Sequence, residues 1–500
     1  MNIKQMLERP VKEVPRKEAI VCGSRRVTYH ELGETSTKIA NALIGLGMKK
    51  NDHVAILLPH NPDWLINYFG IIKAGGIAVL LNSMFKAPEL DSLLRNSDSQ
   101  ILITENSFSQ MLSPVLPTLP LLKHVIEIDS DSYEKMLAHS SPTSPSVEFK
   151  DEDEADIIYT SGTSGMPKGA IHTHSSLLAG GSVFAQGIRQ TKEYIVTDPV
   201  PFFHVHGLLA CAFPTFLTGS TMVILPRLTP RTILETIERE KITWIHGITV
   251  MYLAMMRLDD KVFKEYDYSS LQGAAGGGMA LPAEISKKFQ DTFGVNLMEG
   301  YGMTEVPPII MVNPYDKPKS GTMGKPIIEV RLLNDQGEEV RPGEVGEVVV
   351  RGPNVLKGYY KLPELNAQAF REGWFYTGDL ASMDEEGYYV FAERKSFIIK
   401  TFAGNMIAPT EVEKVLLQHP SVSEAAVVAR GADRLRGEAP FAFVVLKKGH
   451  AATAKELRAF CRQRLANYKV PRKVILHDHL SKTASGKVDR ARLKDLASQK

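Results

Sequence analysis

The chain has 500 residues, of which 43% are hydrophobic and 23% are charged, with 38 glycines and 29 prolines. A chain of this length exceeds one typical domain and can bury a large core, which excludes disorder, collagen and coiled coil as whole-chain descriptions. Its formal net charge of +2 provides no overall field that would favour nucleic acid or a membrane surface as a partner.

The cysteines Cys22, Cys211 and Cys461 lie far apart and outside any metal-ligand spacing. They therefore predict neither a disulfide framework nor a structural zinc site, and they favour a reducing compartment. The N-terminal segment is charged and lacks the apolar stretch of a signal peptide. We expect a soluble, cytoplasmic protein with no integral membrane segment.

Helical and strand patterns alternate along most of the chain. Thr28 and Glu31 have the spacing of a capping box and predict the start of a helix. His53–Pro59 predicts a buried strand, and the serine- and proline-rich stretch Ser140–Ser146 predicts a linker. The long uncharged run Gly207–Pro226 is interrupted by proline and glycine, so it predicts a buried strand-turn-strand and not a membrane span.

The pattern changes near the C-terminus. Asp384–Gly387 is turn-like and lies between two strand-like runs, which predicts a hairpin. Pro409, followed by a second capping-box spacing from Thr410 to Glu413, predicts the start of another helix.

Charge is unevenly distributed between the two parts of the chain. Residues 397–500 contain 20 Lys and Arg against 9 Asp and Glu, a balance of +11, which leaves −9 for the rest. We therefore predict a large α/β body over residues 1–393 and a small α+β domain over residues 394–500. The basic small domain is suited to a partner that carries phosphate groups.

The strongest chemical signal follows an apolar strand that begins at Asp156. Glycines there allow backbone N–H groups to converge, while hydroxyls and one ammonium add further donors, which together suit a triphosphate. Gly169 follows the lysine, so the string is not a Walker A loop. A flexible serine-glycine linker is the alternative, but the preceding strand and the varied string disfavour it. The predicted phosphate-binding residues are Thr160, Ser161, Gly162, Thr163, Ser164, Gly165 and Lys168.

This loop resembles the phosphate loop of the adenylate-forming superfamily, which includes acyl-CoA and aryl-CoA synthetases, luciferases and peptide-synthetase adenylation domains. Three further strings resemble motifs of that family in the same order: Gly300–Glu305, Tyr376–Asp379 and Ser481–Lys487. The resemblance implies a large multi-subdomain body with a small mobile C-terminal domain. It also implies that ATP and a carboxylic acid form an acyl-adenylate, which CoA then converts to a thioester.

The resemblance assigns roles to individual residues. Tyr301 is expected to stack on adenine, Thr304 to donate to the α-phosphate and Glu305 to hold Mg²⁺, which prefers oxygen ligands. Asp379, an acceptor-only carboxylate when ionised, is expected to bind the ribose hydroxyls. Lys487 is expected to contact both the carboxylate and the phosphate, since a cation between two anions cancels their repulsion.

Other motif positions imply further contacts. In Pro201–Gly207 the resemblance points to His204 beside the acyl group, in preference to His206. Gly276–Gly278 resembles the glycine strand between adenine and the acyl pocket, which makes Gly277 and Gly278 binding residues. Lys482 is the competing candidate for the lysine motif, and Lys487 is preferred because it follows Gly486.

The hinge region departs from the family pattern. Arg394 takes the ribose-contacting position, and Lys400 falls where some members carry a lysine for the second step. Ser396 replaces the usual hinge Asp or Lys, and Thr401–Asn405 replaces a pair of glycines along the route of the CoA thiol. A luciferase-like or adenylate-only activity therefore remains an alternative.

Substrate class is suggested by what the pocket motifs lack. Phe202–Val205 offers no Asp for a substrate ammonium, and Gly300 stands where malonate-activating relatives tend to carry Arg. Trp244–Tyr252 with Met279 predicts an apolar wall, which favours a monocarboxylic, above all a fatty, acid. An aryl acid or malonate-type CoA ligase and a non-enzymatic nucleotide-binding sensor remain alternatives. The expected partners are the acid, ATP and CoA, with no nucleic acid and with the oligomeric state open.

Overall fold

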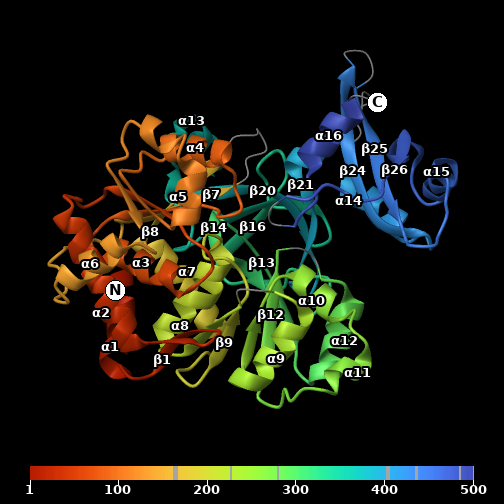
Figure 1. Ribbon diagram of the computed structural model, residues 1–500. Coiled ribbons are helices and arrows are strands. Elements are labelled where there is room, and N and C mark those ends of the chain that lie inside the picture. The colour runs from red at the N-terminus through yellow and green to blue at the C-terminus, as the bar shows by residue number, and fades with distance from the viewer. Residues whose placement is uncertain are drawn as a thin grey trace. The chain divides into compact units, whose positions relative to one another are not determined.

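The computed structural model describes residues 1–160, 167–225, 228–278, 281–400, 406–433, 437–483 and 486–498. The chain forms two compact units (Figure 1). Unit 1 comprises Met1–Val330 and Val350–Phe375, and unit 2 comprises Arg331–Val349 and Tyr376–Lys500. The predicted α/β class is confirmed. The domain boundary expected between residues 393 and 394 stays a prediction.

Unit 1 contains a nine-stranded sheet whose central strands are parallel. The chain passes from β9 to β10 on one side and then to β11 on the other side of β9, so the winding direction reverses between β9 and β11. In open α/β sheets, ligands bind at such a reversal, beyond the carboxyl ends of the strands. The strands in order are β15 (Lys325–Pro326), β14 (Val306–Val312), β13 (Leu297–Met303), β12 (Gly273–Gly277), β11 (Trp244–His246), β9 (Ile195–Asp198), β10 (Thr221–Ile224), β1 (Glu18–Cys22) and β2 (Arg25–Thr28).

A second, seven-stranded sheet completes the body of unit 1. Five of its strands are parallel, and β8 and β18 extend it antiparallel at one edge. Buried hydrophobic runs such as Val54 to Leu58 explain why these strands form, because both sheet faces are covered. In order the strands are β18 (Gly358–Tyr359), β8 (Lys168–Thr173), β7 (Glu154–Thr160), β4 (Ile77–Leu80), β3 (His53–Leu57), β5 (Ile101–Thr104) and β6 (His124–Glu127).

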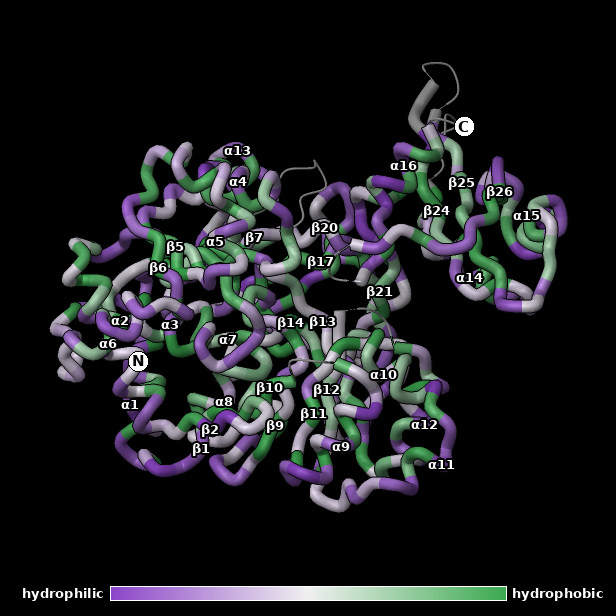
Figure 2. Tube along the Cα trace, in the orientation of Figure 1, coloured by the Kyte–Doolittle hydropathy of each residue, from purple (hydrophilic) through white to green (hydrophobic). Residues whose placement is uncertain are grey.

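Helices of unit 1 form layers around the two sheets. Helix α3 (Pro62–Lys73) packs against β1, β3 and β4, and α7 (His174–Gly187) packs against β8 and β14, so both lie between the sheets. Figure 2 shows that hydrophobic stretches follow the strands, as this layering requires. The remaining helices are α1 (Ile3–Glu13), α2 (Tyr29–Gly45), α4 (Ala87–Asn96), α5 (Asn106–Leu112), η1 (Leu116–Thr118), α6 (Asp131–His139), η2 (His206–Ala212), α8 (Phe213–Thr218), α9 (Pro230–Glu240), α10 (Thr249–Met255), α11 (Asp260–Phe263), α12 (Ala283–Phe293) and α13 (Pro363–Ala369).

Unit 2 contains most of a five-stranded sheet of order β16-β17-β20-β19, in which β21 also pairs with β20. It also contains a two-stranded sheet of β22 and β23 and a three-stranded sheet of order β24-β25-β26. The strand β20 begins in unit 1, where its first residues pair with β19 (Phe370–Arg371), and continues in unit 2, where it pairs with β21. The elements are β16 (Glu329–Leu333), β17 (Val345–Arg351), β20 (Trp374–Met383), β21 (Tyr389–Arg394), η3 (Lys395–Phe397), β22 (Ile399–Lys400), β23 (Met406–Ile407), α14 (Pro409–Leu417), β24 (Val422–Asp433), β25 (Gly437–Leu446), α15 (Ala454–Arg462), η4 (Asn467–Lys469), β26 (Lys473–Leu476) and α16 (Arg490–Ser498).

Several local predictions are confirmed. Thr28 caps α2 and accepts from the Glu31 N–H, while the Glu31 carboxylate accepts from the Thr28 N–H at 2.7 Å. The turn between β20 and β21 is held by Asp384, whose carboxylate accepts from the N–H groups of Glu386 and Tyr388. The stretch Ser140–Ser146 contains neither helix nor strand.

Two other local predictions are wrong in part. The predicted helix start at Pro409 is confirmed by α14, whose N-cap is Ala408, but the side chains of Thr410 and Glu413 bond to other elements and do not close the predicted capping box. The apolar run after Gly207 begins in the π-helix η2 and α8, and only then forms the strand β10, because continuous burial hides the helical period. Within the described residues, no helix has the length and apolar character needed to cross a membrane.

Candidate active site

The β7–β8 hairpin holds the ends of the predicted phosphate loop. Thr160 closes β7 and pairs with Lys168, the first residue of β8, so the predicted strand before the loop is confirmed. This pairing fixes the positions of Thr160 and Lys168, the two described ends of the motif. The predicted loop residues Ser161, Gly162, Thr163, Ser164 and Gly165 lie outside the described residues.

The second motif forms the turn of another hairpin. In β13 and β14, Met303 pairs with Val306, which leaves Thr304 and Glu305 as the turn residues. The Glu305 carbonyl accepts from the Leu356 N–H at 2.8 Å, and its carboxylate Oε1 accepts from the Tyr359 hydroxyl at 3.0 Å. Backbone and side chain of Glu305 are therefore both held by the segment that leads into β18.

Tyr359 connects the two motifs. It lies in β18, paired with Ala170 of β8, and the Lys168 Nζ is 5.7 Å from the centroid of its ring. At that distance an ammonium over an aromatic face is attracted by the ring quadrupole. Tyr359 therefore contacts the phosphate-loop lysine with its ring and Glu305 with its hydroxyl. Sequence reasoning missed it, because a tyrosine in Gly358–Tyr360 carries no chemical signature of its own.

The glycine strand approaches the adenine motif closely. Gly277 pairs with Gly300, and a Cβ on Gly277 would lie 2.8 Å from the Gly300 carbonyl oxygen. A Cβ on Gly276 would lie 2.8 Å from the ring of Tyr252, and Gly278 has φ +87°, which favours glycine. The structure thus brings the predicted Gly277 and Gly278 beside the strand that carries Tyr301.

The carboxyl ends of β9 and β11 present histidines at the sheet reversal. His204 lies in the segment after β9, with its ring 4.5 Å from the ring of Phe203, and His206 begins η2. Burial lowers the pKa of His206 to about 4. His246, which sequence reasoning placed only within an apolar wall, ends β11 and is fully buried.

Most of that wall belongs to the core. Trp244, Ile245, Met251 and Tyr252 are buried within hydrophobic clusters, and Met279 lies outside the described residues. The Tyr252 hydroxyl donates to the carbonyls of Ile245 and Ala275, which explains how a tyrosine is accommodated there.

Unit 2 brings together the two residues predicted to contact ribose. Asp379 of β20 and Arg394 of β21 are opposite each other, and the Arg394 Nε lies 2.8 Å from the Asp379 Oδ1. The Asp379 side chain is only 3% exposed, whereas that of Arg394 is 42% exposed. The pair therefore has one fixed, buried member and one that extends to the surface.

In the predicted lysine motif, backbone hydrogen bonds join the described residues on either side of positions 484–485. The Thr483 N–H donates to the Lys487 carbonyl at 2.7 Å, and Gly486 has φ +79°. Lys482, the competing candidate, lies 3.0 Å from the Glu424 carboxylate. The side chains of Lys482 and Lys487 are both exposed, so the choice of Lys487 stays a prediction.

The hinge string is partly described. Ser396 lies in η3, and its neighbour Lys395 forms ion pairs with Asp335 and Glu347, each at 2.9 Å. The backbone of Lys400 belongs to β22, but its side chain and residues 401–405 lie outside the described part of the chain.

The donor set of unit 1 fits a magnesium ion bound mainly through nucleotide phosphates. Among the described residues, no group of three or more His, Cys, Asp or Glu side chains could hold a metal by itself. Mg²⁺ is commonly bound by one or two carboxylates together with substrate phosphates and water. Glu305, held at a turn close to Lys168 and Tyr359, provides such a carboxylate.

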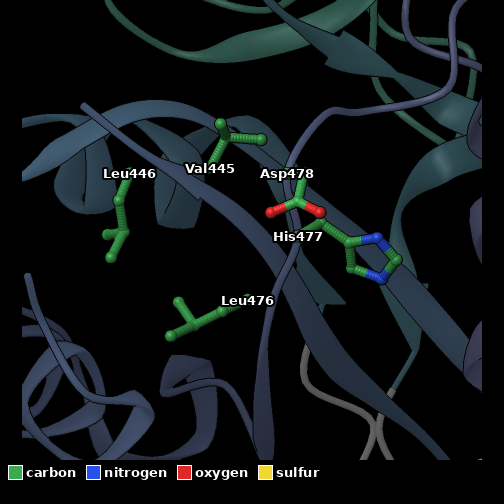
Figure 3. Close-up of a pocket in the computed structure, with 5 residues that line it drawn as sticks. All are labelled: Val445, Leu446, Leu476, His477 and Asp478. Carbon is green, nitrogen blue, oxygen red and sulfur yellow. The ribbon is translucent and has the colours of Figure 1, made fainter. Parts of the chain in front are cut away.

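A hollow of about 380 Å³ in unit 2 lies apart from these motifs. Figure 3 shows Leu446 and Leu476 beside it, with His477 and Asp478. None of the predicted site residues lines it.

Family models, curated relatives and solved structures were compared with this chain, and all three point to the enzyme class that the motifs predict. The AMP-binding enzyme model matches residues 7–360, and the AMP-binding enzyme C-terminal domain model matches residues 411–487. The long-chain-fatty-acid–CoA ligase of Bacillus subtilis (strain 168) is 35% identical over 96% of this chain and 91% of its own length. The feruloyl-CoA synthase of Amycolatopsis sp is 34% identical over 95% of this chain and 94% of its own. The ATP-bound structure of MatB from Rhodopseudomonas palustris superposes with a TM-score of 0.91, 27% identity, and coverage of 100% and 99% of the two chains.

The chain belongs to the AMP-binding enzyme family, the adenylate-forming class that its motifs predicted. Within that class it is an AMP-forming acyl-CoA synthetase that uses ATP and CoA, and this prediction too is confirmed.

Proposed function

We propose that the protein joins a monocarboxylic acid, of the fatty-acid class, to CoA through an acyl-adenylate. The observation that carries the proposal is the contact set of Tyr359, which holds Glu305 and approaches Lys168 within one unit. These groups supply the carboxylate and the ammonium that the motif resemblance assigns to Mg²⁺ and to the phosphates of ATP. Full-length similarity to long-chain-fatty-acid–CoA ligases supports the acid class.

The chemical problem is to bring two anions together. In the proposed first step, the substrate carboxylate attacks the α-phosphorus of ATP and pyrophosphate leaves. Thr304 donates to the α-phosphate, and Lys168 binds the departing phosphates. Lys487 lies between the carboxylate and the phosphate and stabilises the charge that develops there. Tyr301 and Asp379 orient the adenosine, so the reacting atoms meet in one geometry.

Glu305 would hold Mg²⁺ in this proposal. When bound, the ion neutralises phosphate charge and so lowers the repulsion of the attacking carboxylate. Tyr359 orients the Glu305 carboxylate by its hydrogen bond, so the site is arranged before the nucleotide arrives. A group whose position is fixed in advance costs no reorganisation during the reaction.

In the proposed second step, the CoA thiol attacks the acyl carbonyl and AMP leaves. Arg394, paired with Asp379, stays on the ribose side, while Lys400 contributes to the second half-reaction. The basic residues after Phe397 suit the phosphate groups of CoA. We infer that the enzyme works in the cytoplasm, which its three free cysteines also favour.

An aryl acid is the second candidate substrate. The similarity to the feruloyl-CoA synthase of Amycolatopsis sp favours it, with 34% identity over 95% of this chain. Gly300 lacks the cation that a dicarboxylate would need, so a malonate-type activity has less support.

The direct test is product formation from a panel of acids, with ATP and Mg²⁺, in the presence and absence of CoA. We expect AMP and pyrophosphate in equal amounts and a CoA thioester of one acid class. Thioester formation from aryl acids alone would replace the fatty-acid assignment with the second candidate. Adenylate that persists in the presence of CoA would identify an adenylate-only enzyme.

A further inference from the structure

Two histidines at the sheet reversal have buried ring nitrogens without a protein partner. His246 is fully buried, and neither of its ring nitrogens forms a hydrogen bond among the described residues. The Nε2 of His206 is also buried and has no partner in that part of the chain. Burial lowers the pKa of both side chains, so both are neutral at pH 7 and each offers one N–H donor and one acceptor.

The fold places both residues where a ligand is expected. His246 ends β11, and its backbone N–H and carbonyl bond to the Thr197 hydroxyl of β9, at 3.1 and 3.2 Å. His206 lies in the segment that leaves β9 and begins the π-helix η2. The reversal of strand order falls between β9 and β11, and π-helical turns are frequent at functional sites.

The two imidazoles are neighbours. His206 is close enough to interact electrostatically with both His246 and His204. The ring of Phe184 is 5.2 Å from the ring of His246, and the Tyr252 hydroxyl of α10 donates to backbone carbonyls. The described residues therefore supply no hydrogen-bond partner to either ring nitrogen of His246 or to the Nε2 of His206.

A buried polar group without a protein partner points to a water, an ion or a ligand group. An unsubstituted hydrocarbon chain has no hydrogen-bond donor or acceptor for these nitrogens. We propose that the acid bound here is a hydroxy- or oxo-substituted monocarboxylic acid, whose polar group, remote from the carboxylate, bonds to His206 and His246. This inference rests on the proposed function and narrows its substrate class.

Hydroxylated fatty acids and phenolic acids both carry a hydroxyl group remote from the carboxylate, so the test uses both. The probes are fatty acids and their hydroxylated analogues, and cinnamic acid and its para-hydroxy analogue, each measured by pyrophosphate release with ATP, Mg²⁺ and CoA. We expect kcat/KM for the hydroxylated member of at least one pair to exceed that of its partner by at least about tenfold. The pair that shows the preference identifies the aliphatic or the aryl source.

Variants assign the preference to the histidines. His246→Leu removes both nitrogens and is expected to reduce the ratio of kcat/KM values within the preferred pair to near one. His174→Leu is the matched control: His174 is also a buried, neutral imidazole of unit 1, but it packs against Phe149 and Ile3, and the ratio should stay at the wild-type value. If His246→Leu does not fold, His206→Leu replaces it with the same expectation.

The wild-type measurement alone can overturn the inference. Equal or lower kcat/KM for the hydroxylated member of every pair would mean that a water, and not the substrate, satisfies these nitrogens. A preference that survives in the folded His246→Leu or His206→Leu variant would also contradict it. If no acid releases pyrophosphate at all, the proposed function fails instead, and the two failures are therefore distinguishable.

Discussion

Two sets of predicted site residues are held in different ways. Glu305 in unit 1 is fixed by bonds from Leu356 and Tyr359, and Lys168 opens a paired strand. Asp379 in unit 2 is likewise held in a strand, whereas Lys487 of the same unit has an exposed side chain outside any helix or strand. We infer that the groups held by strands mainly bind the nucleotide and that Lys487 mainly reacts.

The largest expected effect comes from Lys487. Lys487→Ala should reduce acyl-adenylate formation by at least about 100-fold, because it removes a cation from the developing charge. Thioester formation from supplied acyl-AMP should stay close to the wild-type rate. Lys482→Ala, which removes a lysine of the same loop that pairs with Glu424, is the control and should have little effect. Equal loss of both half-reactions in Lys487→Ala would contradict the proposed division.

The next effect tests burial in unit 1. Burial raises the pKa of Glu299 to about 7 from 4.5, although the Leu281 N–H donates to its carboxylate. Because the folded protein holds the Glu299 proton more tightly than the unfolded chain does, the contribution of this carboxyl to stability is complete below pH 4.5. It is lost as the pH rises towards 7. Relative to Glu299→Gln, wild-type unfolding free energy should fall by up to about 3 kcal/mol across this window. Denaturant unfolding at several pH values measures this free energy. If the unfolding free energies of the wild type and Glu299→Gln change with pH in the same way, Glu299 ionises normally.

A third effect concerns the ribose pair of unit 2. Asp379→Ala removes the buried acceptor and leaves Arg394 without that ion pair, so the KM for ATP should rise by about tenfold or more. The KM for the acid should change little. Initial rates at varied ATP and acid concentrations separate the two constants, and an unchanged KM for ATP would remove Asp379 from the nucleotide site.

The smallest effect tests how firmly Glu305 is held. Tyr359→Phe deletes the hydroxyl bonded to Glu305 and keeps the ring beside Lys168. The Mg²⁺ concentration for half-maximal activity should rise a few-fold, since one hydrogen bond contributes about 1 kcal/mol. Tyr360→Phe is the neighbouring control, because its hydroxyl bonds to Asp98 instead. The same Mg²⁺ requirement in both variants would show that the Tyr359 bond does not position the carboxylate.

Sequence alone predicted the α/β class of the fold and several local features, because these depend on residues that are neighbours in the chain. The Thr28 cap and the Asp384 turn are closed by neighbours within a few residues, so their spacing was sufficient. Thr410 and Glu413 have the same spacing as a capping box, yet tertiary partners on β21, β24 and α16 capture their side chains. Local spacing cannot exclude such distant partners.

The residues that sequence reasoning missed are those whose role depends on tertiary neighbours. Tyr359 gains its position only because β18 pairs with β8, which lies far from it in the chain. His246 stands in an apolar segment and is distinguished only by the strand reversal beside it and by nitrogens that lack partners. A single sequence shows neither of these features.

The central claim is that this chain activates a carboxylate by bonding it to the α-phosphorus of ATP. The most direct measurement is exchange of labelled pyrophosphate into ATP by the wild-type protein, with Mg²⁺ and acids from the fatty and aryl classes, but without CoA. We predict exchange that depends on the acid and is abolished in Lys487→Ala. Absence of exchange with every acid, or exchange of equal rate in Lys487→Ala, would contradict it.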